Sequence, residues 1–213
     1  MNFFGHAVTA ATHDDSPRFV LGAMLPDLAA MARVRLPEPV DAQVRSGVRF
    51  HHVTDSAFHR NPAFTTACGA ALGELGAAGV ARGPARAVAH VGFELLLDGA
   101  ISGDTRGLTA YRAALEVGAE GVGGSDAPEP WDTLGAMLRR LSAAPVPRAY
   151  DDPAFVAARL HDILGRRPRL SLGPDDFAPV SAWCERARGP IREQAAALSA
   201  EVAEASILAF TAP

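Results

Sequence analysis

Apolar positions along the chain recur mostly at helical spacing, in segments separated by Pro, Gly and Asp residues. Alternating runs of β-branched residues between hairpin dipeptides, which are typical of strands, are nearly absent. The pattern predicts helices at 2–12, 18–34, 41–59, 62–76, 84–99, 105–118, 130–143, 152–165 and 174–210. The predicted fold class is therefore all-α, a compact helical bundle in a single domain covering residues 1–213.

Capping residues predict where several helices start, and two prolines predict where a helix is interrupted or kinked. Asp41 can cap the helix that follows it, and Asp104 or Thr105 can cap the helix near 105–118. Pro26 is expected to interrupt the segment 18–34, and Pro190 is expected to kink the last helix, because proline removes a helical hydrogen bond.

The stretch GAEGVGGSDAPEP, at 118–130, is rich in glycine and polar residues, which predicts a loop. It is the best candidate for a mobile loop that acts as a lid, and a plain surface loop is the alternative interpretation. The loop follows the half of the domain at about 1–100 and lies among the C-terminal helices of about 105–213.

Composition excludes several classes of function. A hydrophobic content of 48% indicates a globular chain, and a net charge of −4 gives no electrostatic reason to bind nucleic acid or an anionic membrane. No apolar run reaches about 18 to 20 residues, so no membrane span is expected. The start of the chain lacks the features of a signal peptide, which predicts a cytoplasmic protein whose two cysteines, Cys68 and Cys184, are reduced.

The segment RFHHVTDSAFH, at 49–59, concentrates metal-binding side chains on the predicted helix 41–59. His51, Asp55 and His59 stand four residues apart and share one stripe with apolar residues of the preceding turns, while His52 lies at its edge. Burying imidazoles beside a carboxylate is costly unless they pair or bind a cation. The stripe therefore predicts a divalent metal site, and the alternative is a half-buried His/Asp pair held by hydrogen bonds.

A second stripe runs along the segment AHVGFELLLDG, at 89–99, where His90, Glu94 and Asp98 again stand four residues apart. The other sides of this helix are apolar, which is typical of a central helix. His90 and Glu94 are predicted to face the first stripe. Asp98 is next to Gly99, and the competing interpretation is that it ends the helix in solvent.

Two more candidates lie near the start of the chain, His6 after NFFG and Asp27 in GAMLPDL. A carboxylate is unexpected in the apolar surroundings of Asp27, and a helix cap after Pro26 is the alternative interpretation. His6 alone is as compatible with a core histidine as with a ligand.

The segments MNFFGHA, VLGAMLPDLA and GVRFHHVTD, followed by an inward helix at 87–99, resemble the acyl-carrier-protein phosphodiesterases over about the first 100 residues. The resemblance implies an all-helical relative of the histidine–aspartate phosphohydrolase fold. It also implies a divalent metal, preferably manganese, that serves to cleave phosphopantetheine from the carrier serine. The positions that match the family motif are His6, Asp27, His51 and Asp55.

This sequence departs from the family pattern at three places. His52 stands where the family has arginine, and His59 stands where it has aspartate. The later segment that carries Asp and His in the family carries His90 and Glu94 here. A larger share of histidine favours zinc or iron over manganese.

The leading hypothesis is a metal-dependent phosphoesterase acting on a phosphoester substrate, with an acyl carrier protein as the partner that the resemblance implies. Glu94, or Asp55 if it is not a ligand, would accept a proton, and Arg49 or Arg60 would hold phosphate. The pool of metal ligands around one or two ions is His6, Asp27, His51, Asp55, His59, His90 and Glu94.

Two other hypotheses stay open. One is a non-catalytic helical binding module with a structural metal, in which protein groups fill every ligand position. The other is a buried polar network in which the histidines and carboxylates pair with each other without any metal.

Overall fold

Side-chain caps start the helices where the sequence predicts them. The structure, a computed structural model, describes residues 1–119, 128–144 and 147–212. The Asp41 carboxylate accepts hydrogen bonds from the backbone N–H groups of Gln43 and Val44, at 2.9 and 3.0 Å. The Asp104 carboxylate accepts one from the N–H of Gly107 at 2.9 Å, which identifies it as the cap in place of Thr105. These bonds satisfy N–H groups that have no partner within the helix.

The predicted all-α class is confirmed, because the described residues contain nine α-helices, two short 3₁₀ helices and no strand. Eight of the predicted segments match an observed helix to within about three residues, and the predicted 174–210 is divided between η2 and α9. The elements are α1 (Phe3–His13), α2 (Pro17–Ala32), α3 (Ala42–Arg60), α4 (Pro62–Ala77), α5 (Arg82–Ile101), α6 (Thr105–Val117), α7 (Pro128–Ser142), η1 (Arg148–Asp151), α8 (Pro153–Gly165), η2 (Pro174–Asp176) and α9 (Phe177–Thr211).

The expectation that Pro26 interrupts its segment is wrong, because α2 continues through it. Proline inside a helix costs roughly 3 kcal/mol through the lost hydrogen bond and the clash of its ring. Burial of the apolar side chains of α2, among them Leu21, Leu25 and Leu28, offsets this cost. Pro190 likewise lies inside α9, and the predicted kink there stays a prediction.

Contacts within the chain define two compact units, and each is described separately. Unit 1 comprises Met1–Phe58, Gly103–Val146 and Ser199–Pro213, and unit 2 comprises His59–Ser102 and Pro147–Leu198. The division falls inside α3 and inside α9. The predicted single domain stays a prediction.

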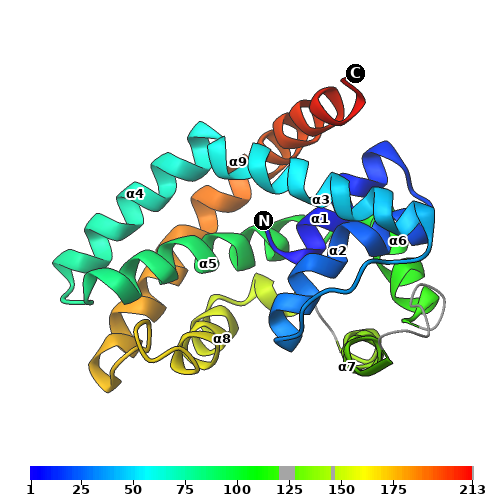
Figure 1. Cartoon of the computed structure of the whole chain (residues 1–213). Coiled ribbons are helices and arrows are strands. Elements are labelled where there is room, and N and C mark those ends of the chain that lie inside the picture. Colours follow the sequence, from blue (N-terminus) through cyan, green and yellow to red (C-terminus); the bar gives the residue numbers. More distant parts are fainter. Residues whose placement is uncertain (120–127, 145–146, 213) are drawn as a thin grey trace. The chain divides into compact units, whose positions relative to one another are not determined.

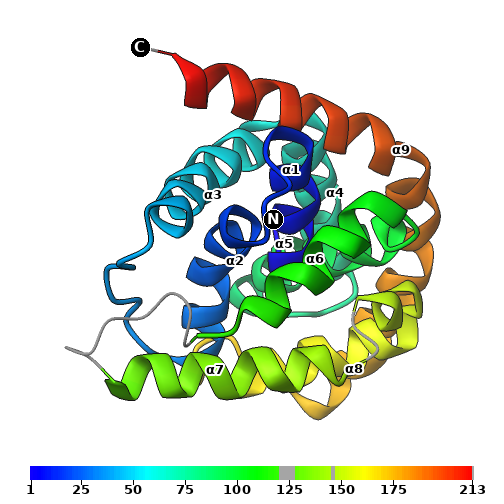
Figure 2. The same ribbon diagram turned by 90° about the vertical axis from the view of Figure 1, so that its right-hand side faces the viewer.

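In unit 1 the first helix is central. All its residues from Phe3 to Ala11 are buried, and α1 packs against α2 and α6 (Figure 2). The ring of Tyr111 on α6 contacts the rings of Phe3 and Phe4, with centroids 6.1 and 5.3 Å apart. This packing holds His6, in the second turn of α1, inside the apolar core.

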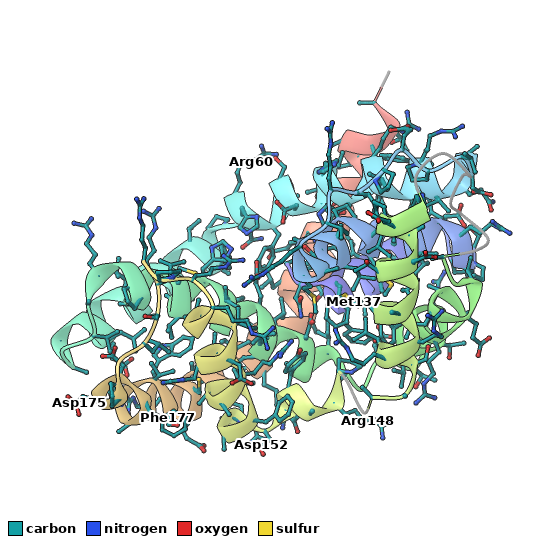
Figure 3. The ribbon with its side chains drawn as sticks, turned by 60° about the horizontal axis from the view of Figure 1, so that its bottom comes forward. Arg60, Met137, Arg148, Asp152, Asp175 and Phe177 are labelled. Carbon is teal, nitrogen blue, oxygen red and sulfur yellow. The ribbon has the colours of Figure 1, made fainter. Side chains whose placement is uncertain are left out.

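In unit 2 the central helix is α5, as the apolar pattern of 84–99 predicts. It lies beside α4 (Figure 1) and also packs against α8 and η1. Asp152 caps α8 by accepting a hydrogen bond from the N–H of Ala154 at 2.9 Å, and it lies at the start of that helix in Figure 3. Gly92 lets α5 approach α9, because a Cβ at this position would lie 2.5 Å from the ring of Trp183.

Two further expectations concern membranes and the Gly-rich loop. Among the described helices, none combines the length and the apolar character that crossing a membrane requires. The loop predicted at 118–130 falls largely on residues 120–127, which are outside the described residues, so the loop and its role as a lid stay predictions.

Candidate metal centres

Helices α2 and α3 approach each other closely in unit 1 because two glycines face each other. A Cβ on Gly22 would lie 2.2 Å from the carbonyl oxygen of Val44 and 2.9 Å from the Cα of Gly47. A Cβ on Gly47 would lie 2.1 Å from the carbonyl oxygen of Phe19. Only glycine permits backbones to come this near, so the crossing requires both residues.

The close crossing brings His51 of α3 against the backbone of α2. Its ring nitrogen Nδ1 lies 2.8 Å from the carbonyl oxygen of Ala23, which can only accept a hydrogen bond. Nδ1 therefore carries the proton, and Nε2 keeps a lone pair that can bind a metal. Histidines that bind metals usually donate their second ring nitrogen in this manner, which fixes the tautomer and the ring orientation.

Burial keeps the His51 ring neutral. The side chain is only 5% exposed, and burial lowers its pKa from 6.5 to about 4, against the hydrogen bond to Ala23 and the charge of Asp55, which raise it. A neutral imidazole is the form that binds a cation, so this ring is ready to act as a ligand near pH 7.

Three other side chains gather beside His51. The rings of His6 and His51 are in contact, with centroids 3.9 Å apart. His6 Nε2 lies 3.8 Å from Asp27 Oδ2 and 3.9 Å from Asp55 Oδ1. His6, Asp27 and His51 each offer one ligand atom, and these atoms lie within 4.8 Å of one another. We call these three residues with Asp55 the His6 group.

The distances between His6 and the two carboxylates fit a divalent ion. Metal–ligand bonds of about 2.1 Å place two ligands of one ion roughly 3.0 to 4.3 Å apart, and the distances from His6 Nε2 to both carboxylates lie in this range. Two imidazoles and two carboxylates are a ligand set that manganese, iron and zinc all accept. Asp27 and Asp55 have side-chain exposures of 27% and 41%, so the group is reachable from solvent on the carboxylate side.

The pKa of His51 predicts how stability depends on pH in the metal-free protein. Between pH 6.5 and about 4 the unfolded chain binds a proton at this residue and the folded chain does not. The free energy of unfolding should therefore fall by about 3 kcal/mol as pH drops through this window and level off below it. Urea unfolding in EDTA, compared between wild type and His51→Gln, measures this contribution. Identical pH dependence of the two proteins would contradict it.

The stripe predicted along 49–59 divides between two groups. His51 and Asp55 belong to the His6 group in unit 1, whereas His59 joins His90 and Glu94 of α5 in unit 2. We call His59, His90 and Glu94 the His59 group. The predicted pool of seven ligands thus forms two sets of possible ligands, and Glu94 as the proton acceptor for the first set stays a prediction.

Three polar residues near 49–60 lie at the surface. His52 is exposed and its ring meets the ring of His51 edge-on, with centroids 5.3 Å apart. The Arg49 guanidinium lies over the ring of Phe210, 5.6 Å from its centroid, and donates to Ser46 at 3.4 Å. Arg60 is exposed at the end of α3 (Figure 3). None of these contacts joins Arg49 or Arg60 to either group, so their role in holding phosphate stays a prediction.

Asp98 corrects one expectation and marks a polar cluster that the sequence does not reveal. The interpretation that it ends a helix in solvent is wrong, because it is fully buried and α5 continues to Ile101. Burial raises the pKa of Tyr150, and so does the charge of Asp98, while a hydrogen bond with Arg159 lowers it. Tyr150 and Arg159 come from segments far from α5 in the chain. The only sequence signal was the position of Asp98 on the inward stripe of α5.

Comparisons of the chain with protein-family models, with curated proteins and with solved structures find no match. The resemblance to the acyl-carrier-protein phosphodiesterases therefore stays a prediction, and so does the relation to the histidine–aspartate phosphohydrolase fold. Both rest on the motif positions in the first 100 residues.

Proposed function

We propose that this protein is a metal-dependent phosphoesterase, and that the His6 group holds its divalent ion. The observation that carries the proposal is the arrangement of His51. Its Nδ1 hydrogen-bonds to the Ala23 carbonyl, so Nε2 keeps a lone pair, and the ring lies against His6 in a group that also contains Asp27. A core histidine with only a structural role would not need a second imidazole and two carboxylates beside it.

A divalent ion in such a site supplies Lewis-acid stabilisation of a phosphoryl oxygen and lowers the pKa of water toward 7. His6 and His51 are buried and can bind only as neutral nitrogen ligands. Asp27 contributes negative charge on the more open side. The group has two carboxylates for two histidines. This mixture of oxygen and nitrogen ligands suits manganese and iron as well as zinc.

Within this proposal Asp55 is the best candidate for the proton acceptor. It is the most exposed member of the group, and its Oδ1 lies 3.5 Å from the N-terminal amine of Met1 as well as 3.9 Å from His6. Solvent and substrate can reach it more easily than they reach His51. The exposed His52, whose ring touches His51, is a candidate to contact the phosphate, at the position where the resembled family has arginine.

The resemblance makes the phosphopantetheine-bearing acyl carrier protein the first substrate to test, and an aryl phosphodiester the generic one. The purified full chain should release p-nitrophenol from bis(p-nitrophenyl) phosphate when manganese, iron(II) or zinc is added, and EDTA should stop the reaction. Release of phosphopantetheine from the carrier would extend the proposal to that substrate. Absence of turnover on both substrates with all three metals would overturn the phosphoesterase and favour the non-catalytic module.

A further inference from the structure

The residues of the His59 group come from two helices, and one aromatic side chain of unit 2 packs against them. His59 lies in the last turn of α3, and His90 and Glu94 stand one turn apart on α5. The ring of Phe64 on α4 meets the rings of both histidines edge-on, with centroids 5.2 and 5.3 Å away. Phe64 is only 4% exposed, so it fixes both imidazoles from the apolar side.

The three ligand atoms form a nearly equilateral triangle. His59 Nε2 lies 3.1 Å from His90 Nε2 and 3.4 Å from Glu94 Oε1. His90 Nε2 lies 3.2 Å from Glu94 Oε1. Bonds of about 2.0 to 2.1 Å to a tetrahedral zinc ion place two ligands roughly 3.3 to 3.4 Å apart, so the triangle has the dimensions of one tetrahedral face.

If only hydrogen bonds held these three atoms together, one of the three close contacts would be unfavourable. If both histidines donate to Glu94, two N–H groups face each other across 3.1 Å. If one histidine donates to the other, the donating proton is no longer directed at the carboxylate. A cation at the centre is attracted to all three atoms at once, because each presents a lone pair to it.

The charge and the exposure of the group also suit a cation. Burial raises the pKa of the Glu94 carboxyl, but neighbouring positive charge and the two imidazoles outweigh burial and hold the pKa well below its usual range, so Glu94 is anionic. The side chains of His59 and His90 are 30% and 44% exposed, so water can reach the group. Zinc sites with three protein ligands and one open position are of the kind that can bind a water or a substrate.

The thiol of Cys68 is not part of the group. Cys68 on α4 donates toward the carbonyl oxygen of Ala89 at 3.5 Å. Burial raises the pKa of its thiol to about 11, and the charge of Glu94 adds to the rise, so Cys68 is a protonated thiol near pH 7 in the metal-free protein. Cys68 therefore provides a matched control, since it lies close to the ligands without belonging to them.

From this geometry we propose that His59, His90 and Glu94 bind one zinc ion in unit 2, with a fourth position that faces solvent. This site shares no residue with the His6 group and does not rest on the phosphoesterase proposal. The two proposals are therefore independent. The zinc site can exist without phosphoesterase activity, and the activity can exist without the zinc site.

Zinc titration of the chelator-stripped full chain, in competition with a chromophoric chelator, tests the proposal. The titration uses His51→Gln as the parent, so that the His6 group is weakened. The parent should bind one zinc ion, and adding His90→Ala or Glu94→Gln should weaken this binding at least about 100-fold. Cys68→Ser in the same parent should bind zinc as the parent does.

Thermal unfolding distinguishes lost binding from lost folding. Zinc at about 100 times its Kd should raise the Tm of the parent by roughly 5 to 10 °C, and should not raise it after His90→Ala. Without zinc the two proteins should unfold at the same temperature, because His90 is nearly half exposed. Retention of tight zinc binding after His90→Ala would overturn the site. Loss of that binding after Cys68→Ser, or its absence from the parent, would overturn it as well.

Discussion

Replacing Asp27 by asparagine should lower kcat/KM for metal-dependent phosphodiester hydrolysis at least about 100-fold. The substitution keeps the size of the side chain but removes the negative charge that faces His6 Nε2 at 3.8 Å. A neutral amide oxygen binds a divalent ion more weakly than a carboxylate does. Asp27 is partly exposed, so the free energy of unfolding of the metal-free protein should stay close to that of the wild type.

The measurement is hydrolysis of bis(p-nitrophenyl) phosphate together with the metal content of the protein after dialysis. Asp15→Asn is the matched control, because it makes the same chemical change at an exposed residue of unit 1 whose salt bridge is with Arg106. The control should keep full activity. Wild-type activity and metal content in Asp27→Asn would contradict the assignment of Asp27 as a ligand.

Asp55→Asn separates the ligands from the proton acceptor within the same experiment. If Asp55 accepts the proton, the variant should keep most of the metal while kcat falls by about 100-fold or more. If Asp55 is mainly a ligand, metal content and activity should fall together, as they should for Asp27→Asn. The two outcomes assign Asp55 to one of the two roles that the sequence leaves open.

The second large effect concerns the glycines at the crossing of α2 and α3. Gly22→Ala should lower the free energy of unfolding by about 3 kcal/mol, because the added Cβ would lie 2.2 Å from the Val44 carbonyl oxygen. The atom it meets is backbone, so relief requires the two helices to move apart. That movement also separates His51 from the Ala23 carbonyl, and metal affinity at the His6 group should fall with stability.

Urea unfolding monitored by circular dichroism measures the effect on stability. Gly103→Ala, also in unit 1, is the control, because a Cβ there would meet nothing within 4 Å. Its free energy of unfolding should change by no more than about 0.5 kcal/mol. Equal stability of Gly22→Ala and Gly103→Ala would show that the crossing tolerates a side chain. Gly47→Ala offers a second variant at the same contact.

The sequence predicted most helix boundaries because the signals that set them are local. Asp41, Asp104 and Asp152 each accept a hydrogen bond from an N–H two or three residues away, which needs no information about the rest of the chain. The expectation about Pro26 failed for the opposite reason. A proline interrupts an isolated helix, and burial of the apolar side chains around it, which no local signal reports, keeps α2 continuous.

The chemistry of the candidate sites was also present in the sequence, but its grouping was not. Spacing placed His51, Asp55 and His59 on one stripe of a helix, and it placed His90 and Glu94 on one stripe of another. A stripe gives the direction in which side chains point and does not identify what they meet. Packing decided that His51 meets His6 of α1 and that His59 meets α5.

The sequence by itself therefore determined the helical class, the positions of the helices and the residues that can bind metal. Those properties depend on side-chain type and on spacing within one or two turns. The tertiary structure alone decided that Ala23 fixes the tautomer of His51, that Asp98 is buried, and that the candidate ligands form two groups. Each of these depends on contacts between helices, and close crossings such as that of Gly22 and Gly47 bring the contacting side chains together.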